Sequence, residues 1–165
     1  MLLAPVVVGN HLLYNKYLYI VKTTNQTKFS LFFADGTRLT YGNCLVACIA
    51  SILDEPIDEV PNLYTFYGLD EKENKETEDH LWFKVINLWL EKKYKKVLIK
   101  HPLDEPTQEP FVIMRGLSMR GKPHTCIFEN REGNLVPYFD PHPTKQYLST
   151  QHYYYTIENI WKASL

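Results

Sequence analysis

The sequence predicts an α+β fold in a single domain that spans residues 1–165. Three observations predict this class: strand-like apolar segments near both ends of the chain, a nearly all-apolar segment over residues 44–53, and a segment with helical spacing over residues 81–93. The chain thus runs from strands through two helices into further strands. Because a tight turn joins two of the later strands, we expect these strands to form an antiparallel sheet.

In the first half of the chain, the predicted secondary structure changes from strands to a helix at residue 44. Before it, strands are expected over residues 12–14, 17–21 and 29–33, with a turn at Asp35-Gly36. Residues 44–53 then read CLVACIASIL, a run that is longer than most strands and contains no glycine or proline. Start and stop signals flank it, at Gly42-Asn43 and Asp54-Glu55-Pro56. The run therefore predicts a buried helix, which a short helical turn over residues 56–61 follows.

The second half of the chain predicts one more helix and a sheet. The helix follows the cap-like Thr77-Glu78-Asp79, and its apolar positions are Leu81, Trp82, Val85, Ile86, Leu88 and Trp89. Strands are expected over residues 97–99, 111–114, 124–128, 135–139 and 153–155, and a short helix through Trp161. Glu132-Gly133-Asn134 is typical of a tight hairpin turn between two of these strands.

Composition excludes several classes of function. The 18 Lys and Arg residues nearly balance the 19 Asp and Glu residues, and this near-zero net charge disfavours nucleic-acid binding. No apolar run is long enough to span a bilayer, and the N-terminus lacks the features of a secretory signal. Three cysteines do not form a disulfide framework in a chain of this size. We therefore expect a cytoplasmic protein that acts neither on nucleic acid nor in a membrane.

Three residues stand where they could act together chemically. Cys44 begins the predicted buried helix, where the helix dipole favours a thiolate and unpaired N–H groups can stabilise an oxyanion. His124 begins one predicted strand and Asp140 ends the next, so a hairpin would bring the two side by side. Asp140 would then orient the imidazole, and the imidazole would take the Cys44 proton. This is the logic of a nucleophile, a base and an orienting group.

The motifs that carry a family resemblance are Gly42-Asn43-Cys44-x-x-Ala47-Cys48-x-Ala50-Ser51, Asp58-Glu59-Val60-Pro61, His124 and Asp140-Pro141-His142-Pro143. In this order they resemble papain-like cysteine peptidases, in which a helix that begins with cysteine precedes a histidine strand and an aspartate or asparagine strand. The pattern is most similar to the C39-like branch and to small papain-like proteins of phage and bacterial genomes. The resemblance covers residues 36–148, between a β-rich N-terminal extension and an aromatic C-terminal extension.

The resemblance implies a papain-like fold and a cysteine hydrolase that cleaves a peptide or isopeptide bond. It assigns Cys44 as nucleophile, His124 as base and Asp140 as orienter, acting on a protein or peptide substrate without a cofactor or metal. Deamidation or transamidation would use the same triad. Papain-like enzymes usually place a glutamine about six residues before the cysteine to complete the oxyanion hole. Position 38 is Arg38, which leaves Asn43 or backbone amides as the expected donors.

Other interpretations of these residues stay open. A catalytically inactive papain-like protein that binds a host or phage protein would also explain the missing glutamine. Cys44, Cys48, His124 and Cys126 could alternatively form a structural zinc site, although no C-x2-C knuckle is present. Otherwise Cys48 and Cys126 are expected in the core. Arg115 and Arg120 are expected in solvent, with an acidic substrate group as an alternative partner; His142 is expected in a loop.

Overall fold

A computed structural model describes residues 7–8, 11–12, 21–28, 31–32, 38–40, 42–62 and 75–161 of the chain. For the four short N-terminal strands and for residues 75–81, it describes the backbone alone. Those strands are β1 (Val7–Val8), β2 (His11–Leu12), β3 (Leu31–Phe32) and β4 (Arg38–Thr40), and they pair antiparallel as β1 with β2 and β3 with β4.

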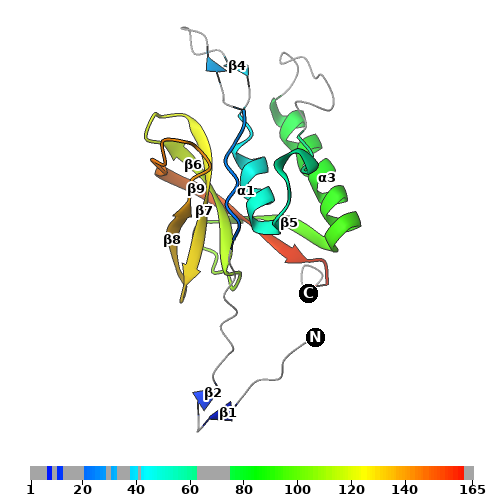
Figure 1. Ribbon diagram of the computed structural model, residues 1–165, viewed down its shortest axis with the longest axis vertical. Helices are drawn as coiled ribbons and strands as arrows, with labels where there is room; N and C mark the ends of the chain where they lie inside the picture. Colours follow the sequence, from blue (N-terminus) through cyan, green and yellow to red (C-terminus); the bar gives the residue numbers. More distant parts are fainter. Residues whose placement is uncertain are drawn as a thin grey trace.

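A five-stranded antiparallel sheet forms the centre of the fold (Figure 1). Its strands are β5 (Lys96–Pro102), β6 (Phe111–Ser118), β7 (Pro123–Arg131), β8 (Asn134–Phe139) and β9 (Leu148–Asn159). They lie in the order β5-β9-β6-β7-β8. The helices are α1 (Cys44–Leu53), the short 3-10 helix η1 (Ile57–Glu59) and α3 (Lys75–Tyr94). The predicted α+β class and antiparallel sheet are confirmed.

Helix α1 forms where the sequence predicts it, and its two ends are built differently. At the C-terminal end Asp54 adopts a left-handed conformation with φ 54°, and the N–H groups of Asp54 and Glu55 bond to carbonyls of the last turn. At the N-terminal end the Asn43 side chain makes no capping hydrogen bond, and the first turn holds no acidic residue. The first-turn N–H groups therefore donate to no side-chain atom of Asn43, although the N–H of Ala47 donates to the Asn43 carbonyl oxygen.

Helix α3 begins earlier than the sequence predicts. Thr77-Glu78-Asp79 was expected to precede the helix, but the helix starts at Lys75 and includes these residues. Lysine and glutamate are good helix formers, and acidic side chains favour the first turns because they oppose the helix dipole. The residues that look like a cap therefore lie inside the helix. Residues 63–74, expected to form a polar loop together with residues 75–77, lie outside the described part.

The sheet is apolar on both faces. Ile113, Ile127 and Tyr155 pack with the helices in one buried cluster, to which α1 contributes Cys48 and Ile49. The alternate positions point to the opposite face. There Val112, Met114, Cys126, Phe128 and Tyr154 form a second buried cluster, against which Tyr147 and Leu148 pack. Burial on both faces explains why the central strands read as nearly continuous apolar runs.

The aromatic C-terminal segment is part of the sheet itself. Strand β9 includes Tyr153 to Tyr155 and lies between β5 and β6, with Tyr154 fully buried. The predicted strand is thus confirmed and longer than expected. The helix expected through Trp161 is wrong as far as the structure describes it, because residues 160–161 form a turn. Of the strands predicted near the N-terminus, residues 13–14, 17–20, 29–30 and 33 lie outside the described residues.

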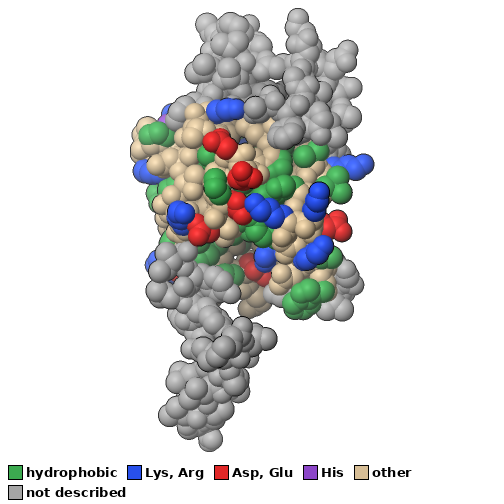
Figure 2. All heavy atoms as spheres, turned by 45° about the vertical axis from the view of Figure 1, so that its right-hand side comes forward, with side chains coloured by type: hydrophobic (Ala, Val, Ile, Leu, Met, Phe, Trp, Pro, Cys, Tyr) green, Lys and Arg blue, Asp and Glu red, His purple; other side chains and the backbone are tan. Residues whose placement is uncertain are grey.

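The helix side of the molecule mixes charges of both signs (Figure 2). Ion pairs on described residues include Lys22 with Asp54 at 3.2 Å and Lys93 with Glu55 at 2.9 Å. Such mixing fits a formal net charge of −1 and gives no single-sign field on this face. Neither α1 nor α3, over the residues described, is both long and apolar enough to cross a membrane.

Candidate functional site

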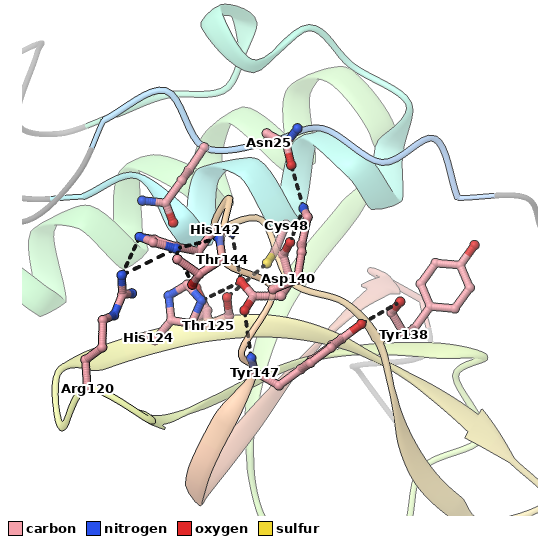
Figure 3. Close-up of polar contacts among 12 residues, drawn as sticks. Asn25, Cys48, Arg120, His124, Thr125, Tyr138, Asp140, His142, Thr144 and Tyr147 are labelled. Carbon is pink, nitrogen blue, oxygen red and sulfur yellow. Dashed lines mark hydrogen bonds and ion pairs between the residues drawn. The ribbon is translucent and has the colours of Figure 1, made fainter.

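The β7–β8 hairpin brings His124 and Asp140 together, as the sequence predicts. Its two-residue turn places Glu132 at φ 56° and Gly133 at φ 90°, the left-handed values that a tight hairpin turn needs. The resulting register pairs Ile127 with Phe139, so Asp140 directly follows the end of β8. There Oδ1 of Asp140 lies 2.7 Å from Nε2 of His124 (Figure 3). The expected base and its expected orienter are therefore in hydrogen-bond contact.

Two backbone groups hold the Asp140 carboxylate in place. The N–H of His142 donates to Oδ1 at 2.8 Å, and the N–H of Tyr147 donates to Oδ2 at 2.8 Å. Asp140 is only 1% exposed. Burial acts to raise its pKa, but the hydrogen bonds from His124, His142 and Tyr147 outweigh burial and lower it. The side chain is thus a fixed carboxylate at neutral pH.

A glycine allows strand β9 to pack closely against β6, the strand that pairs with β7 at His124. Gly116 lies directly opposite His124 in the β6–β7 register, and the β6–β9 register shifts between Arg115 and Gly116. A Cβ atom at Gly116 would lie 1.8 Å from the carbonyl oxygen of Thr150. Any larger residue would therefore push β9 away from the strand pair that carries His124.

Cys44 is the first residue of α1 and meets His124 across the helix–sheet boundary. Burial acts to raise the pKa of the Cys44 thiol. A hydrogen bond with His124 and the positive charge of that ring outweigh burial, and together with Arg115 and Thr125 they lower the pKa to about 7. Because Nε2 of His124 is bound to Asp140, Nδ1 is the ring nitrogen left for the thiol. The three predicted triad residues are thus brought together.

The pKa of His124 shifts in the opposite direction from that of Cys44. Burial acts to lower it, but hydrogen bonds with Asp140, Cys126 and Cys44 raise it to about 11. The imidazole thus holds its proton at a pH where the Cys44 thiol has begun to lose its own. A thiolate–imidazolium pair at neutral pH is the electrostatic state of an activated cysteine nucleophile.

The other two cysteines are buried thiols of a different kind. Sγ of Cys48 donates to the carbonyl oxygen of Thr125 at 3.7 Å, and burial raises its pKa well above 9. Burial also raises the pKa of Cys126, although a hydrogen bond with His124 opposes the shift. Both lie in the buried clusters, as expected. Cys126 additionally packs behind the His124 ring.

Asn43 is committed to a structural contact. Its Oδ1 accepts hydrogen bonds from the N–H groups of Thr27 and Lys28, at 3.1 and 2.9 Å, and its Nδ2 donates to Oγ1 of Thr27 at 3.0 Å. These bonds fasten residues 21–28 to the start of α1. A role of Asn43 in the oxyanion hole stays a prediction, and one amide hydrogen remains to serve it.

Gln26 is a candidate that the sequence did not single out. It is 7% exposed, and its backbone N–H donates to the carbonyl oxygen of Pro141, directly after Asp140. Its Nε2 donates at 3.0 Å to the same Lys28 oxygen that accepts from the N–H of Asn43. Its Oε1 has no hydrogen-bond partner among the described residues. A buried amide is therefore tied through Lys28 to the residue before α1, and its backbone is tied to the Asp140 loop.

One group of side chains in the described part of the chain has the donors for a metal ion. His124, Cys126 and Asp140 each offer one donor atom, all within 4.8 Å of one another. In this structure, however, His124 and Asp140 hydrogen-bond each other, and backbone N–H groups engage both oxygens of Asp140. Cys48, which the zinc hypothesis includes, instead donates to Thr125. We interpret the group as a hydrogen-bonded network around His124.

The outer edge of the site carries cationic and imidazole groups (Figure 3). The ring of His142 stands perpendicular to that of His124, with 6.0 Å between centroids. Nη1 of Arg120 lies 2.5 Å from Nε2 of His142. Burial and the Arg120 charge lower the pKa of His142, so that ring is neutral at pH 7. His142 is in a loop, as predicted, and it connects Arg120 to the triad.

Comparison with known proteins yields no relative for this chain. No protein-family model matches it, and no curated protein or solved structure matches it at a significant level. The assignment of a function therefore depends on the chemistry of the site.

Proposed function

We propose that this protein is a cysteine hydrolase with a papain-like fold that cleaves the amide bond of a peptide or isopeptide substrate. Cys44 is the nucleophile, His124 the proton carrier and Asp140 the orienting carboxylate. The observation that carries the proposal is the Asp140–His124 hydrogen bond of 2.7 Å beside a helix-terminal thiol whose pKa is lowered to about 7. A buried cysteine without such a partner has a raised pKa, as Cys48 does.

The proposed reaction has two stages. The Cys44 thiolate attacks the substrate carbonyl carbon, and a C–S bond forms while the carbonyl oxygen becomes an oxyanion. The His124 imidazolium gives its proton to the amide nitrogen, the C–N bond breaks, and the amine leaves. In the second stage, water loses a proton to His124 and attacks the thioester, which releases the acid and restores Cys44. An amine in place of water would give transamidation, and a side-chain amide as substrate would give deamidation.

Two groups support an oxyanion at the first turn of α1. The N–H groups there lack a side-chain cap, because Asn43 binds residues 27 and 28 instead. Nε2 of Gln26 donates to the carbonyl oxygen of Lys28, and in our proposal its second N–H is a side-chain donor at the same helix end. In our proposal Gln26 takes the role of the oxyanion-hole glutamine that papain-like enzymes usually place about six residues before the cysteine, where this chain has Arg38. The missing glutamine of the sequence pattern is thus replaced from an earlier segment of the chain.

Covalent labelling tests the proposal before any substrate is known. We expect iodoacetamide at neutral pH to modify Cys44 faster than a free exposed thiol, while Cys48 and Cys126 of the folded protein stay unmodified. Peptide mapping by mass spectrometry identifies the labelled residue. The proposal fails if Cys44 reacts no faster than free glutathione and His124→Gln leaves that rate unchanged.

Gln26 has its own test, which separates turnover from thiol activation. Once a cleaved peptide substrate has been found, Gln26→Ala should lower kcat by about tenfold to a hundredfold, as for loss of one oxyanion donor. The rate of Cys44 labelling should stay near that of the unaltered protein, because the ion pair is intact. Gln108→Ala, at an exposed glutamine, is the matched control. Equal kcat values for the two variants would remove Gln26 from the mechanism.

A specific observation favours the second candidate, a catalytically inactive papain-like protein that binds another protein. Cys44, His124 and Asp140 are 8%, 4% and 1% exposed, so a substrate would reach little of the triad in this conformation. Under this alternative the triad stabilises the fold and the partner binds elsewhere. Retention of the biological effect and of the bound partner by Cys44→Ala would favour it over the hydrolase.

A further inference from the structure

Two arginines flank the Cys44–His124 pair, and the proposed reaction does not use either of them. Arg115 belongs to β6 and Arg120 to the turn that leads into β7. They reach the site from different elements.

Strand register places Arg115 opposite the residue that follows His124. Arg115 lies directly opposite Thr125 in the β6–β7 pair, and directly opposed residues of neighbouring strands share one face of a sheet. Thr125 directly follows His124 in β7, and its backbone oxygen accepts a hydrogen bond from Sγ of Cys48, one helical turn after Cys44 in α1. The positive charge of Arg115 acts to lower the pKa of the Cys44 thiol. The guanidinium is therefore close enough to influence the sulfur electrostatically.

Arg120 approaches the site through His142. Its Nη1 lies 2.5 Å from Nε2 of His142, whose ring meets the His124 ring edge-on (Figure 3). His142 is also held by Thr144, whose Oγ1 lies 2.8 Å from Nδ1 of the ring. Arg120 is exposed, so its remaining N–H groups are open to solvent and to a ligand.

Neither arginine pairs with an acid in the described part of the chain. Among the described residues, no ion pair includes Arg115 or Arg120. The acid at the site is Asp140, and its oxygens are taken up by His124 and by two backbone N–H groups. Lys145, also nearby, is occupied differently: its Nζ donates to Oδ1 of Asn25 and to the backbone oxygen of Asp140. The positive charges of Arg115 and Arg120 are therefore available to bind an anion near the thiolate.

We propose that Arg115 and Arg120 form a carboxylate-recognition subsite beside Cys44, so that the substrate carries a carboxylate close to the amide bond that is cleaved. This inference rests on the proposed hydrolase function and names its substrate class. Arginine is suited to the task because its planar fork of N–H groups matches the two oxygens of a carboxylate.

A pair of alkylating reagents of equal chemistry and different charge tests the subsite without a known substrate. Iodoacetate and iodoacetamide both form an S–CH2 bond with the Cys44 thiolate and release iodide, but only iodoacetate carries a carboxylate. We compare the ratio of their rates in the unaltered protein with the ratio in Arg115→Gln and Arg120→Gln. The His124 imidazolium is present in all of these proteins, so its attraction for iodoacetate cancels.

The subsite predicts that each substitution lowers the iodoacetate-to-iodoacetamide ratio by about threefold to tenfold at low salt. Arg131→Gln, at the far end of β7, is the matched control because it removes the same charge away from the site, and its ratio should be unchanged. Ratios for Arg115→Gln and Arg120→Gln equal to that of Arg131→Gln would overturn the subsite. In that case fast labelling of Cys44 by iodoacetamide would leave the hydrolase proposal standing, whereas slow labelling by both reagents would remove it.

The source of the carboxylate is settled by protection of Cys44 from iodoacetamide. Acetyl-Glu-Ala-amide offers a side-chain carboxylate, acetyl-Ala-Ala with a free C-terminus offers a terminal one, and acetyl-Gln-Ala-amide offers neither. Protection by the first indicates an acidic residue in the substrate, and protection by the second indicates a chain end. Protection by the neutral peptide equal to that by both acids would overturn the proposal, as would no protection by any of them.

Discussion

Cys44 and Cys48 are four residues apart on one helix and both are buried, yet their thiols differ in pKa by more than the contrast in burial can explain. Burial is the largest influence on each and raises both. Only Cys44 has a histidine beside it, and that ring lowers its pKa to about 7, whereas the pKa of Cys48 rises well above 9. One turn of helix therefore separates the proposed nucleophile from a core residue. The partner, not the burial, decides which is which.

The largest effect should come from removing the nucleophile. Cys44→Ser should lower the rate of substrate cleavage by about a thousandfold or more, because a serine hydroxyl is not ionised by this histidine. The measurement is single-turnover hydrolysis of a peptide found by library screening. Cys48→Ser is the matched control, at the buried thiol one turn along. Similar losses in both variants would mean that the helix as a whole, rather than Cys44, supports the activity.

Removing the histidine should make Cys44 resemble Cys48. In His124→Gln the thiol keeps its burial and loses the hydrogen bond and charge that oppose it, so its pKa should rise to 9 or above. At pH 7 we expect iodoacetamide labelling of Cys44 to slow by about a hundredfold, since the thiolate fraction falls with each unit of pKa. A labelling rate within a factor of about two of the unaltered protein would contradict the ion pair.

A milder change to the proposed orienting group, Asp140, should produce part of the effect that His124→Gln produces. Asp140→Asn keeps the size of the side chain but removes the charge that raises the pKa of His124. We expect activity to fall by about tenfold to a hundredfold and the apparent pKa of Cys44 to rise, since the imidazolium is less favoured. Asp104→Asn, at an exposed acid in a loop, controls for the loss of charge. Activity that responds equally to both substitutions would dissociate Asp140 from the triad.

The smallest effect should be on stability. Here the substitution of Cys48 should have a larger effect than the substitution of Cys44, which reverses their order for activity. Cys48→Ala leaves a small cavity in the apolar cluster and should lower the free energy of unfolding by about 1–2 kcal/mol. Cys44→Ala should cost less than Cys48→Ala, because it removes one buried negative charge and leaves His124 paired with Asp140. Urea denaturation followed by circular dichroism measures both. A larger loss in Cys44→Ala would identify the triad as a stabilising feature.

The contact of His124 with Asp140 and the start of α1 at Cys44 could be predicted from the sequence, because these positions depend on local signals. An apolar run with start and stop residues fixes the beginning of α1, and the turn at Glu132 and Gly133 fixes the hairpin that pairs His124 with Asp140. The strands over residues 96–139 could be predicted for the same reason, since short apolar runs and the turn residues that bound them are visible within a few positions.

The surroundings of the triad could not be predicted, because they depend on contacts between distant segments. Gln26 stands in a polar stretch with no local signal, and its place follows from hydrogen bonds to Lys28 and Pro141. The position of Arg115 relative to the site depends on the strand register that pairs it with Thr125. The position of β9 between β5 and β6 is likewise a non-local pairing that spacing alone does not reveal.

The pH dependence of Cys44 labelling tests the central claim most directly. A thiol reacts as its thiolate, so the rate rises with pH through the pKa of the thiol. With the pKa of Cys44 lowered to about 7, the rate of iodoacetamide labelling should reach half its plateau at about pH 7. In His124→Gln the midpoint should move to 9 or above. A midpoint near 9 in the unaltered protein, or one that His124→Gln does not move, would contradict the account.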